Sequence, residues 1–216
     1  MIQVEIWSDF VCPFCYIGKR RFERALDQFE HKDEVKVVFR SFELDPHAPQ
    51  VQDQNVHERL AEKYGMSLEQ AKAMNERVGR LAEEVGLHYD FDNMKPTNTF
   101  DAHRLSHFAK REGKMGEMTE RLMKAYFTEG LHIGKHEQLA DLASEVGMER
   151  EKVLDMLRKN DFSEEVRRDE FIARQIGITG VPFFLFNQTY AVSGAQSSDV
   201  FLDVLKKVWE EQDVSG

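Results

Sequence analysis

The sequence Cys-Pro-Phe-Cys at residues 12–15 lies where a strand pattern changes into a helix pattern, and this junction constrains the fold most strongly. Apolar and polar side chains alternate over residues 2–6, which is typical of a strand with one buried face. From Pro13 onward, apolar side chains recur at the spacing of an amphipathic helix. The pattern therefore predicts Cys12 at a helix N-terminus and Pro13 at the first helical position, where proline loses no hydrogen bond.

The two cysteines of this motif are the only ones in the 216-residue chain. A disulfide that closes so short a loop stabilises the fold by only about 2 kcal/mol through the entropy of the unfolded state. A redox role is therefore favoured over a structural disulfide for this pair. The unpaired N–H groups and the dipole of the helix favour a thiolate at Cys12. We therefore expect Cys12 to face outward and attack a substrate sulfur, and Cys15, one turn further in, to resolve the mixed disulfide.

A zinc half-site and a pair of inert buried thiols are the alternatives for these cysteines. Zinc would need two further ligands, and only histidines or carboxylates remain to supply them. Two histidine pairs have a spacing of four residues, His103 with His107 and His132 with His136. Because no third ligand accompanies either pair, surface or packing roles are favoured for them, and we predict no metal site.

The rest of the chain predicts helices between two groups of strands. A second strand pattern at residues 35–42 completes a strand–helix–strand unit. The middle of the chain carries helix patterns with capping residues and glycine stops. The expected helices cover residues 67–86, 99–112, 116–128, 136–146 and 149–159. A capping box at Asp161–Glu164 is expected to open another helix, and a hairpin over residues 183–192 precedes a last amphipathic helix.

These patterns predict an α/β protein in two parts. Residues 1–48 and 161–216 are expected to form one α/β domain, built from the N-terminal strand–helix–strand unit and the C-terminal hairpin and helix. Residues 49–160 are expected to form an all-α insertion between them.

The segment from Trp7 to Gly18 resembles the active-site segment of the FrnE-like branch of the DsbA-like thioredoxin superfamily, whose members more often carry Trp where Phe14 stands. The resemblance covers nearly the whole chain. It continues at Asn98, Ala102–Leu105, Glu129–Gly130, Gly177–Phe184 and Ser193–Gln196. It implies a thioredoxin fold with a helical insertion, a cis proline facing the cysteines, and thiol–disulfide oxidoreductase or isomerase activity.

The resemblance also assigns residues around the cysteines. A cis bond before Pro182 would turn the backbone of Val181 toward the cysteines and offer it to an extended substrate peptide, whereas an ordinary strand-initiating proline is the alternative. Phe14 stands where DsbA proteins carry His, so we expect a less oxidising pair. Asn98 and His103 are expected to line a pocket over the cysteines.

The charge and hydropathy of the chain disfavour some classes of binding partner. The chain has 39 acidic and 29 basic side chains and a formal net charge of −10, which disfavours nucleic-acid binding. No apolar stretch approaches the roughly 18 residues of a membrane span. The N-terminal residues lack the pattern of a secretory signal, so a cytoplasmic protein is expected.

Taken with the resemblance, the sequence favours a cytoplasmic thiol–disulfide oxidoreductase or isomerase that acts on protein or small thiol and disulfide substrates. Its only redox group would be the disulfide itself, with no bound cofactor and with glutathione or a thioredoxin system as co-substrate. The first alternative is a glutathione-dependent isomerase or kappa-type glutathione transferase, although such enzymes typically carry serine where Cys12 stands. The second is a chaperone module whose cysteines sense oxidants. The net direction of exchange and the oligomeric state stay open.

Overall fold

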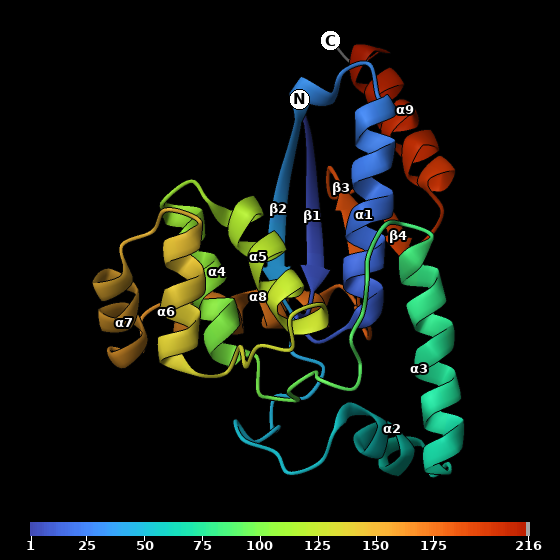
Figure 1. Cartoon of the computed structure of the whole chain (residues 1–216). Coiled ribbons are helices and arrows are strands. Elements are labelled where there is room, and N and C mark those ends of the chain that lie inside the picture. The colour runs from blue at the N-terminus through green and yellow to red at the C-terminus, as the bar shows by residue number, and fades with distance from the viewer. Residues whose placement is uncertain (215–216) are drawn as a thin grey trace. The chain divides into compact units, whose positions relative to one another are not determined.

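The computed structural model describes residues 1–214 of the chain, and these form two compact units (Figure 1). Unit 1 comprises residues 1–44 together with the chain from residue 169 onward. Unit 2 comprises residues 45–168. Of the predicted α/β domain, residues 215 and 216 lie outside the described part.

Unit 1 ends at residue 44 and resumes at residue 169, whereas the sequence patterns place these boundaries after residues 48 and 160. Residues 45–48 belong to unit 2, where the Pro46 carbonyl accepts a hydrogen bond from the Asn98 side chain. The start of the next segment also belongs to unit 2, because the Asp161 carbonyl accepts a hydrogen bond of 2.8 Å from Arg104 Nε. Long-range contacts of this kind decide where a unit ends, and a change of sequence pattern does not record them.

Unit 1 is a mixed sheet with helices packed on it. Its elements are β1 (Ile2–Ser8), α1 (Pro13–Gln28), the 3₁₀ turn η1 (Lys32–Glu34), β2 (Val35–Ser41), the second half of α8 (Ser163–Gln175), β3 (Phe183–Phe186), β4 (Tyr190–Ser193) and α9 (Ser198–Val214). The strand order is β2-β1-β3-β4. β1 pairs with β2 in parallel and with β3 antiparallel, and β3 pairs antiparallel with β4.

Helices α1 and α9 lie side by side on one face of this sheet (Figure 1). Phe22 of α1 is central to the core there, because its ring centroid lies 5.7 Å from that of Phe184 in β3 and 5.7 Å from that of Phe201 in α9. The buried members of this core are Ile2, Val4, Ile6, Phe22, Ala25, Phe29, Phe184, Phe186, Val192, Phe201, Leu205 and Val208. The aromatic hairpin therefore contributes directly to the core.

Strand β1 is buried on both faces, so the expectation of one buried face was wrong. Its second face carries Trp7, whose ring packs with Ala173 of α8 and Ile178 and whose Nε1 donates to the Asp169 carbonyl at 3.1 Å. Glu5 on the same face is also buried and pairs with Arg40 of β2. The central position of β1 in the sheet explains this burial.

Unit 2 is helical, as expected for the insertion. Its elements are α2 (Val56–Tyr64), α3 (Leu68–Glu83), α4 (Phe100–Arg111), α5 (Met115–Phe127), α6 (His136–Glu145), α7 (Arg150–Arg158) and the first half of α8. The predicted capping box at the start of α3 is confirmed, since Ser67 and Gln70 bind each other's backbone N–H groups. Glycine stops such as Gly113 and Gly147 have the positive φ of a left-handed C-cap.

The capping box predicted at Asp161–Glu164 was wrong, because α8 begins two residues later, at Ser163. The backbone there turns through positive φ at Asn160 (57°) and Phe162 (63°). The Arg104 guanidinium, 1% exposed, binds the carbonyls of Met156 and Leu157 at the end of α7. Each of these carbonyls also accepts a backbone N–H, Met156 from Asp161 and Leu157 from Asn160, so the buried cation adds a second donor to both. Within residues 1–214, no helix combines the length and the apolar character that crossing a membrane requires.

Candidate active site

The cysteine pair lies at the N-terminus of α1. In the chain, α1 is the first helix after β1 (Figure 1). Cys12 is the N-cap residue, with an extended backbone (φ −88°, ψ 112°), and Pro13 opens the helix. The Cys15 N–H donates to the Cys12 carbonyl at 3.0 Å. The strand-to-helix junction therefore places both sulfur-bearing residues in the first helical turn, as the sequence pattern predicts.

The Cys12 thiol points to the loop before β3. Its Sγ lies 3.6 Å from the carbonyl oxygen of Val181, and the peptide bond between Val181 and Pro182 is cis. The thiol makes no capping hydrogen bond to α1. Both cysteines are free thiols, and the Cys12 S–H donates to this carbonyl.

Both cysteines are buried, and the expectation that Cys12 faces outward was wrong. Cys12 is 5% exposed and Cys15 is 2% exposed, whereas Phe14 between them is 42% exposed. The sequence places Cys12 at a helix end, but it does not show that another segment, the Val181 loop, comes back against the thiol. The exposed apolar ring of Phe14 is the accessible part of the motif.

Burial has a chemical consequence for Cys15. Loss of solvent raises the pKa of the Cys15 thiol well above its usual value, and the hydrogen bond and charge of the neighbouring Cys12 raise it further. A hydrogen bond from the Asp9 main chain acts in the opposite direction and lowers that pKa. Cys15 is therefore a protonated thiol at neutral pH.

The approach of α1 to the Pro182 loop depends on a glycine whose role the sequence analysis missed. A Cβ at Gly18 would lie 3.0 Å from Pro182 Cγ and 3.4 Å from the Cβ of Ala195. From the same helix, Arg21 donates to the Ala195 carbonyl at 2.7 Å. The Gly194 N–H in turn donates to the Pro182 carbonyl at 2.8 Å. A glycine inside an amphipathic helix is the sequence signal that points to such a close approach.

The basic residues near the start of α1 bind other groups of unit 1. Lys19 and Arg20 both bind the Glu23 carboxylate, at 2.5 and 2.8 Å. Arg20 also lies over the Tyr16 ring, 5.0 Å from its centroid. Arg21 holds the Ala195 loop as described. These side chains therefore serve the packing of α1, and Lys19 is buried rather than solvated.

Asn98 and His103 lie in unit 2. The Asn98 side chain organises the loop before α4, because its oxygen accepts from the Phe100 N–H at 2.9 Å and its amide donates to the Pro46 carbonyl at 3.3 Å. His103 is a buried residue of α4. Their expected place over the cysteines stays a prediction.

The paired histidines have protein partners. His136 Nε2 lies 2.8 Å from Asp101, and His132 Nδ1 accepts from the Gly134 N–H at 3.2 Å. Burial and the positive charge of Lys135 lower the pKa of His132. Within residues 1–214, no three His, Cys, Asp or Glu side chains are grouped so that they could hold a metal ion.

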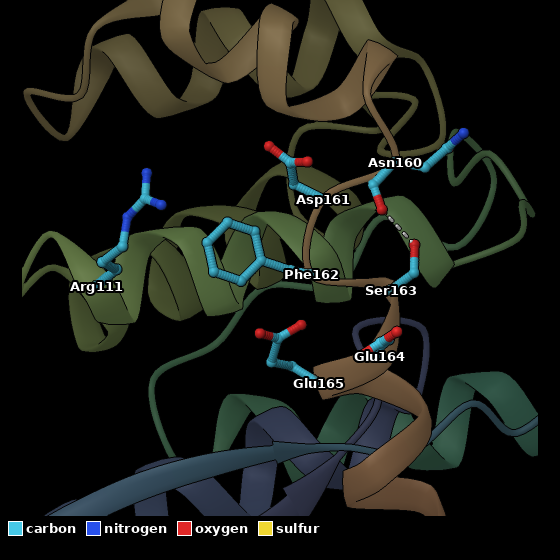
Figure 2. A pocket seen from close by; sticks show the side chains of 7 residues that line it. All are labelled: Arg111, Asn160, Asp161, Phe162, Ser163, Glu164 and Glu165. Atoms are coloured by element: carbon cyan, nitrogen blue, oxygen red, sulfur yellow. Dashed lines mark hydrogen bonds between the residues drawn. The ribbon is translucent and has the colours of Figure 1, made fainter.

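Unit 2 also contains a cavity of about 390 Å³ at the start of α8 (Figure 2). Phe162 lies beside Arg111, whose guanidinium is 5.2 Å from the centroid of its ring (Figure 2). The Ser163 hydroxyl donates to the Asn160 carbonyl at 2.7 Å. The cavity is lined by Arg111 and by residues 160–165, and none of the predicted site residues lies among them.

Residues 3–206 match the family described as the DSBA-like thioredoxin domain. The chain belongs to this family. A curated relative, the uncharacterized protein YwbO of Bacillus subtilis, is 31% identical over 93% of this chain and 94% of its own length. The superfamily expected from the sequence is thereby confirmed, while the FrnE-like branch stays a prediction.

Solved structures give the same result. A probable DsbA oxidoreductase from Streptomyces coelicolor shares 43% sequence identity and a TM-score of 0.93, over 98% of this chain and 91% of that chain. The cytosolic disulfide reductase DsbM from Pseudomonas aeruginosa, 16% identical, has a TM-score of 0.68 over 96% of this chain and 98% of that chain. The predicted thioredoxin fold with a helical insertion is confirmed by these likenesses together with the family match. DsbA-like oxidoreductases use a redox-active disulfide and need no bound cofactor.

Proposed function

We propose that the protein is a thiol–disulfide oxidoreductase or isomerase whose redox group is the Cys12–Cys15 pair. The observation that carries this proposal is the position of the Cys12 sulfur, at the N-terminus of α1 and 3.6 Å from the carbonyl before Pro182. A helix N-terminus stabilises a sulfur anion, and the neighbouring carbonyl marks a main-chain edge beside which an extended peptide can bind. Both features favour a cysteine that forms and then breaks a mixed disulfide with a polypeptide substrate.

The reaction proceeds in two exchanges. The Cys12 thiolate attacks one sulfur of a substrate disulfide, the S–S bond breaks, and the departing thiolate takes up a proton. Cys15 then loses its proton and attacks the Cys12 sulfur of the mixed disulfide, which releases the second substrate thiol. The substrate disulfide is thereby reduced to two thiols while the cysteine pair is oxidised to a disulfide. The reverse sequence oxidises a dithiol substrate.

The surroundings of the pair favour the reducing direction in a cytoplasmic setting. Phe14 contributes no positive charge beside Cys12, so the thiolate lacks one source of stabilisation that would make the pair a strong oxidant. Lys19 and Arg20 are bound to Glu23, whose carboxylate offsets one of their two positive charges. We expect a pair that a glutathione or thioredoxin system keeps reduced, and that acts on protein or small disulfides.

A redox titration tests this function. The purified protein is equilibrated in a series of glutathione buffers, and its free thiols are counted by alkylation and mass spectrometry. We expect one reversible two-electron transition confined to Cys12 and Cys15, which Cys12→Ser abolishes. A pair that stays dithiol throughout would contradict the proposal. Isomerisation or transfer that depends on glutathione and survives Cys15→Ala would favour a glutathione-dependent isomerase or transferase instead.

A further inference from the structure

Asp9 is a buried carboxylate in the loop that joins β1 to α1. Its side chain lies three residues before Cys12, and the residue is 1% exposed. One carboxylate oxygen accepts the Phe10 N–H at 2.8 Å, and the other accepts the Leu44 N–H at 2.8 Å. Leu44 is the last residue of unit 1 before the chain enters unit 2. The carboxylate thus ties the loop that carries the cysteines to the chain segment that follows β2.

The main chain of Asp9 contacts both cysteines. Its carbonyl accepts the Cys12 N–H at 3.2 Å, and its N–H serves as a hydrogen-bond donor to the Cys15 thiol. A charged acceptor holds backbone N–H groups more strongly than a neutral one does. The side chain therefore fixes a backbone segment whose own polar groups face the two reactive residues.

We propose that Asp9 is a positioning residue of the redox pair, and that its carboxylate holds the loop so that the Asp9 main chain stays bonded to Cys12 and Cys15. The inference rests on the proposed function. The step most exposed to its loss is the second exchange, in which Cys15 must give up its proton and attack. The bond from the Asp9 main chain is one of the contacts that ease this deprotonation against the effect of burial.

The experiment separates the two exchanges. Oxidised glutathione is mixed with reduced protein, and quenched-flow alkylation with mass spectrometry follows first the formation and then the release of the glutathione adduct on Cys12. Asp9→Asn keeps the shape and one acceptor oxygen, whereas Asp9→Ala removes both acceptors. Asp169→Asn is the matched control, because Asp169 is equally buried in unit 1 and also accepts a backbone N–H, from Ser41, but its carboxylate pairs with Arg40.

We expect release of the adduct to slow about tenfold in Asp9→Ala, because the loop no longer holds the Asp9 main chain against Cys15. Release should slow less in Asp9→Asn, and adduct formation should change much less in both variants. Asp169→Asn should leave the ratio of the two rates unchanged. Both Asp9 variants lose the same charge. Equal rates in the two variants, or faster release, would therefore show that charge rather than positioning governs the step, and would overturn the inference. An equal loss of formation and release would overturn it as well.

A measurement on the wild-type protein covers the case in which the variants do not fold. The Phe10 and Leu44 amide protons should exchange with solvent as slowly as those of the β1 core, since a buried carboxylate holds them. Exchange at the rate of exposed loop amides would overturn the inference. If the wild-type protein forms no adduct at Cys12, both the proposed function and the role of Asp9 are overturned. If the wild-type protein forms and releases the adduct, and both Asp9 variants do so at the wild-type rates, only the role of Asp9 is overturned.

Discussion

The Cys12 sulfur lies 3.6 Å from the Val181 carbonyl oxygen, although the two residues are 169 positions apart in the chain. This contact joins the N-terminal and C-terminal segments of unit 1 at the start of α1. One partner comes from the first strand–helix junction and the other from the loop before β3. The chemistry proposed for the protein depends on this contact, because the Val181 carbonyl is the hydrogen-bond acceptor of the neutral Cys12 thiol.

Replacing Gly18 by Ala is expected to disturb this junction. The new Cβ would lie 3.0 Å from Pro182 Cγ, so the Pro182 loop must move away from α1. We expect a lower rate of glutathione-adduct formation at Cys12 and a lower melting temperature. Gly79→Ala in α3 is the control, because a Cβ there meets only the Phe91 ring at 3.7 Å and should stabilise the helix by roughly 0.5–1 kcal/mol. Unchanged exchange kinetics in Gly18→Ala would show that the loop is not held by this contact.

The raised pKa of the Cys15 thiol predicts a pH dependence of stability for the reduced protein. Because the folded-state pKa lies above the unfolded value near 9.0, the thiol contributes stability that is fully present below pH 9. That contribution is lost as the pH rises through the folded pKa, at up to about 1.4 kcal/mol per pH unit. Urea unfolding under reducing conditions should show a free-energy difference between wild type and Cys15→Ala that falls above pH 9. A difference that stays constant from pH 7 to pH 10 would contradict this account.

Phe14→His should make the pair more oxidising. Phe14 is the exposed residue of the motif, so an imidazolium at this position can lie near the Cys12 sulfur and favour its thiolate, and with it the reduced form. The reduction potential, measured against glutathione, is expected to rise. Phe14→Tyr keeps a neutral aromatic ring and serves as the control. An equal potential in all three proteins would show that position 14 does not tune the pair.

The sequence predicted those parts of the fold that local signals determine. The capping box of Ser67 with Gln70 and the change of period at Pro13 each depend on residues within one helical turn, and both are found in the structure. The capping box expected at Asp161 is absent because a long-range contact holds this segment. The Asp161 carbonyl accepts a hydrogen bond from Arg104 of α4, and the backbone turns at Phe162 before the helix begins.

The candidate site was predicted only in part. The placement of Cys12 at a helix N-terminus follows from a pattern of neighbouring residues, so the sequence predicted it correctly. Its burial does not follow, because the Val181 loop that meets it is distant in sequence. Asp9 was missed for the same reason, since one of the two N–H groups that its carboxylate binds belongs to Leu44, beyond the second strand.

The most direct test of the central claim is to trap the mixed disulfide. Cys15→Ala protein is incubated with oxidised glutathione, and peptide mass spectrometry locates the adduct, with wild type and Cys12→Ser in parallel. The account predicts a persistent glutathione adduct on Cys12 in Cys15→Ala, a transient one in wild type that ends as a Cys12–Cys15 disulfide, and none at this site in Cys12→Ser. An adduct that persists equally in wild type and Cys15→Ala, or that never forms on Cys12, would contradict the account.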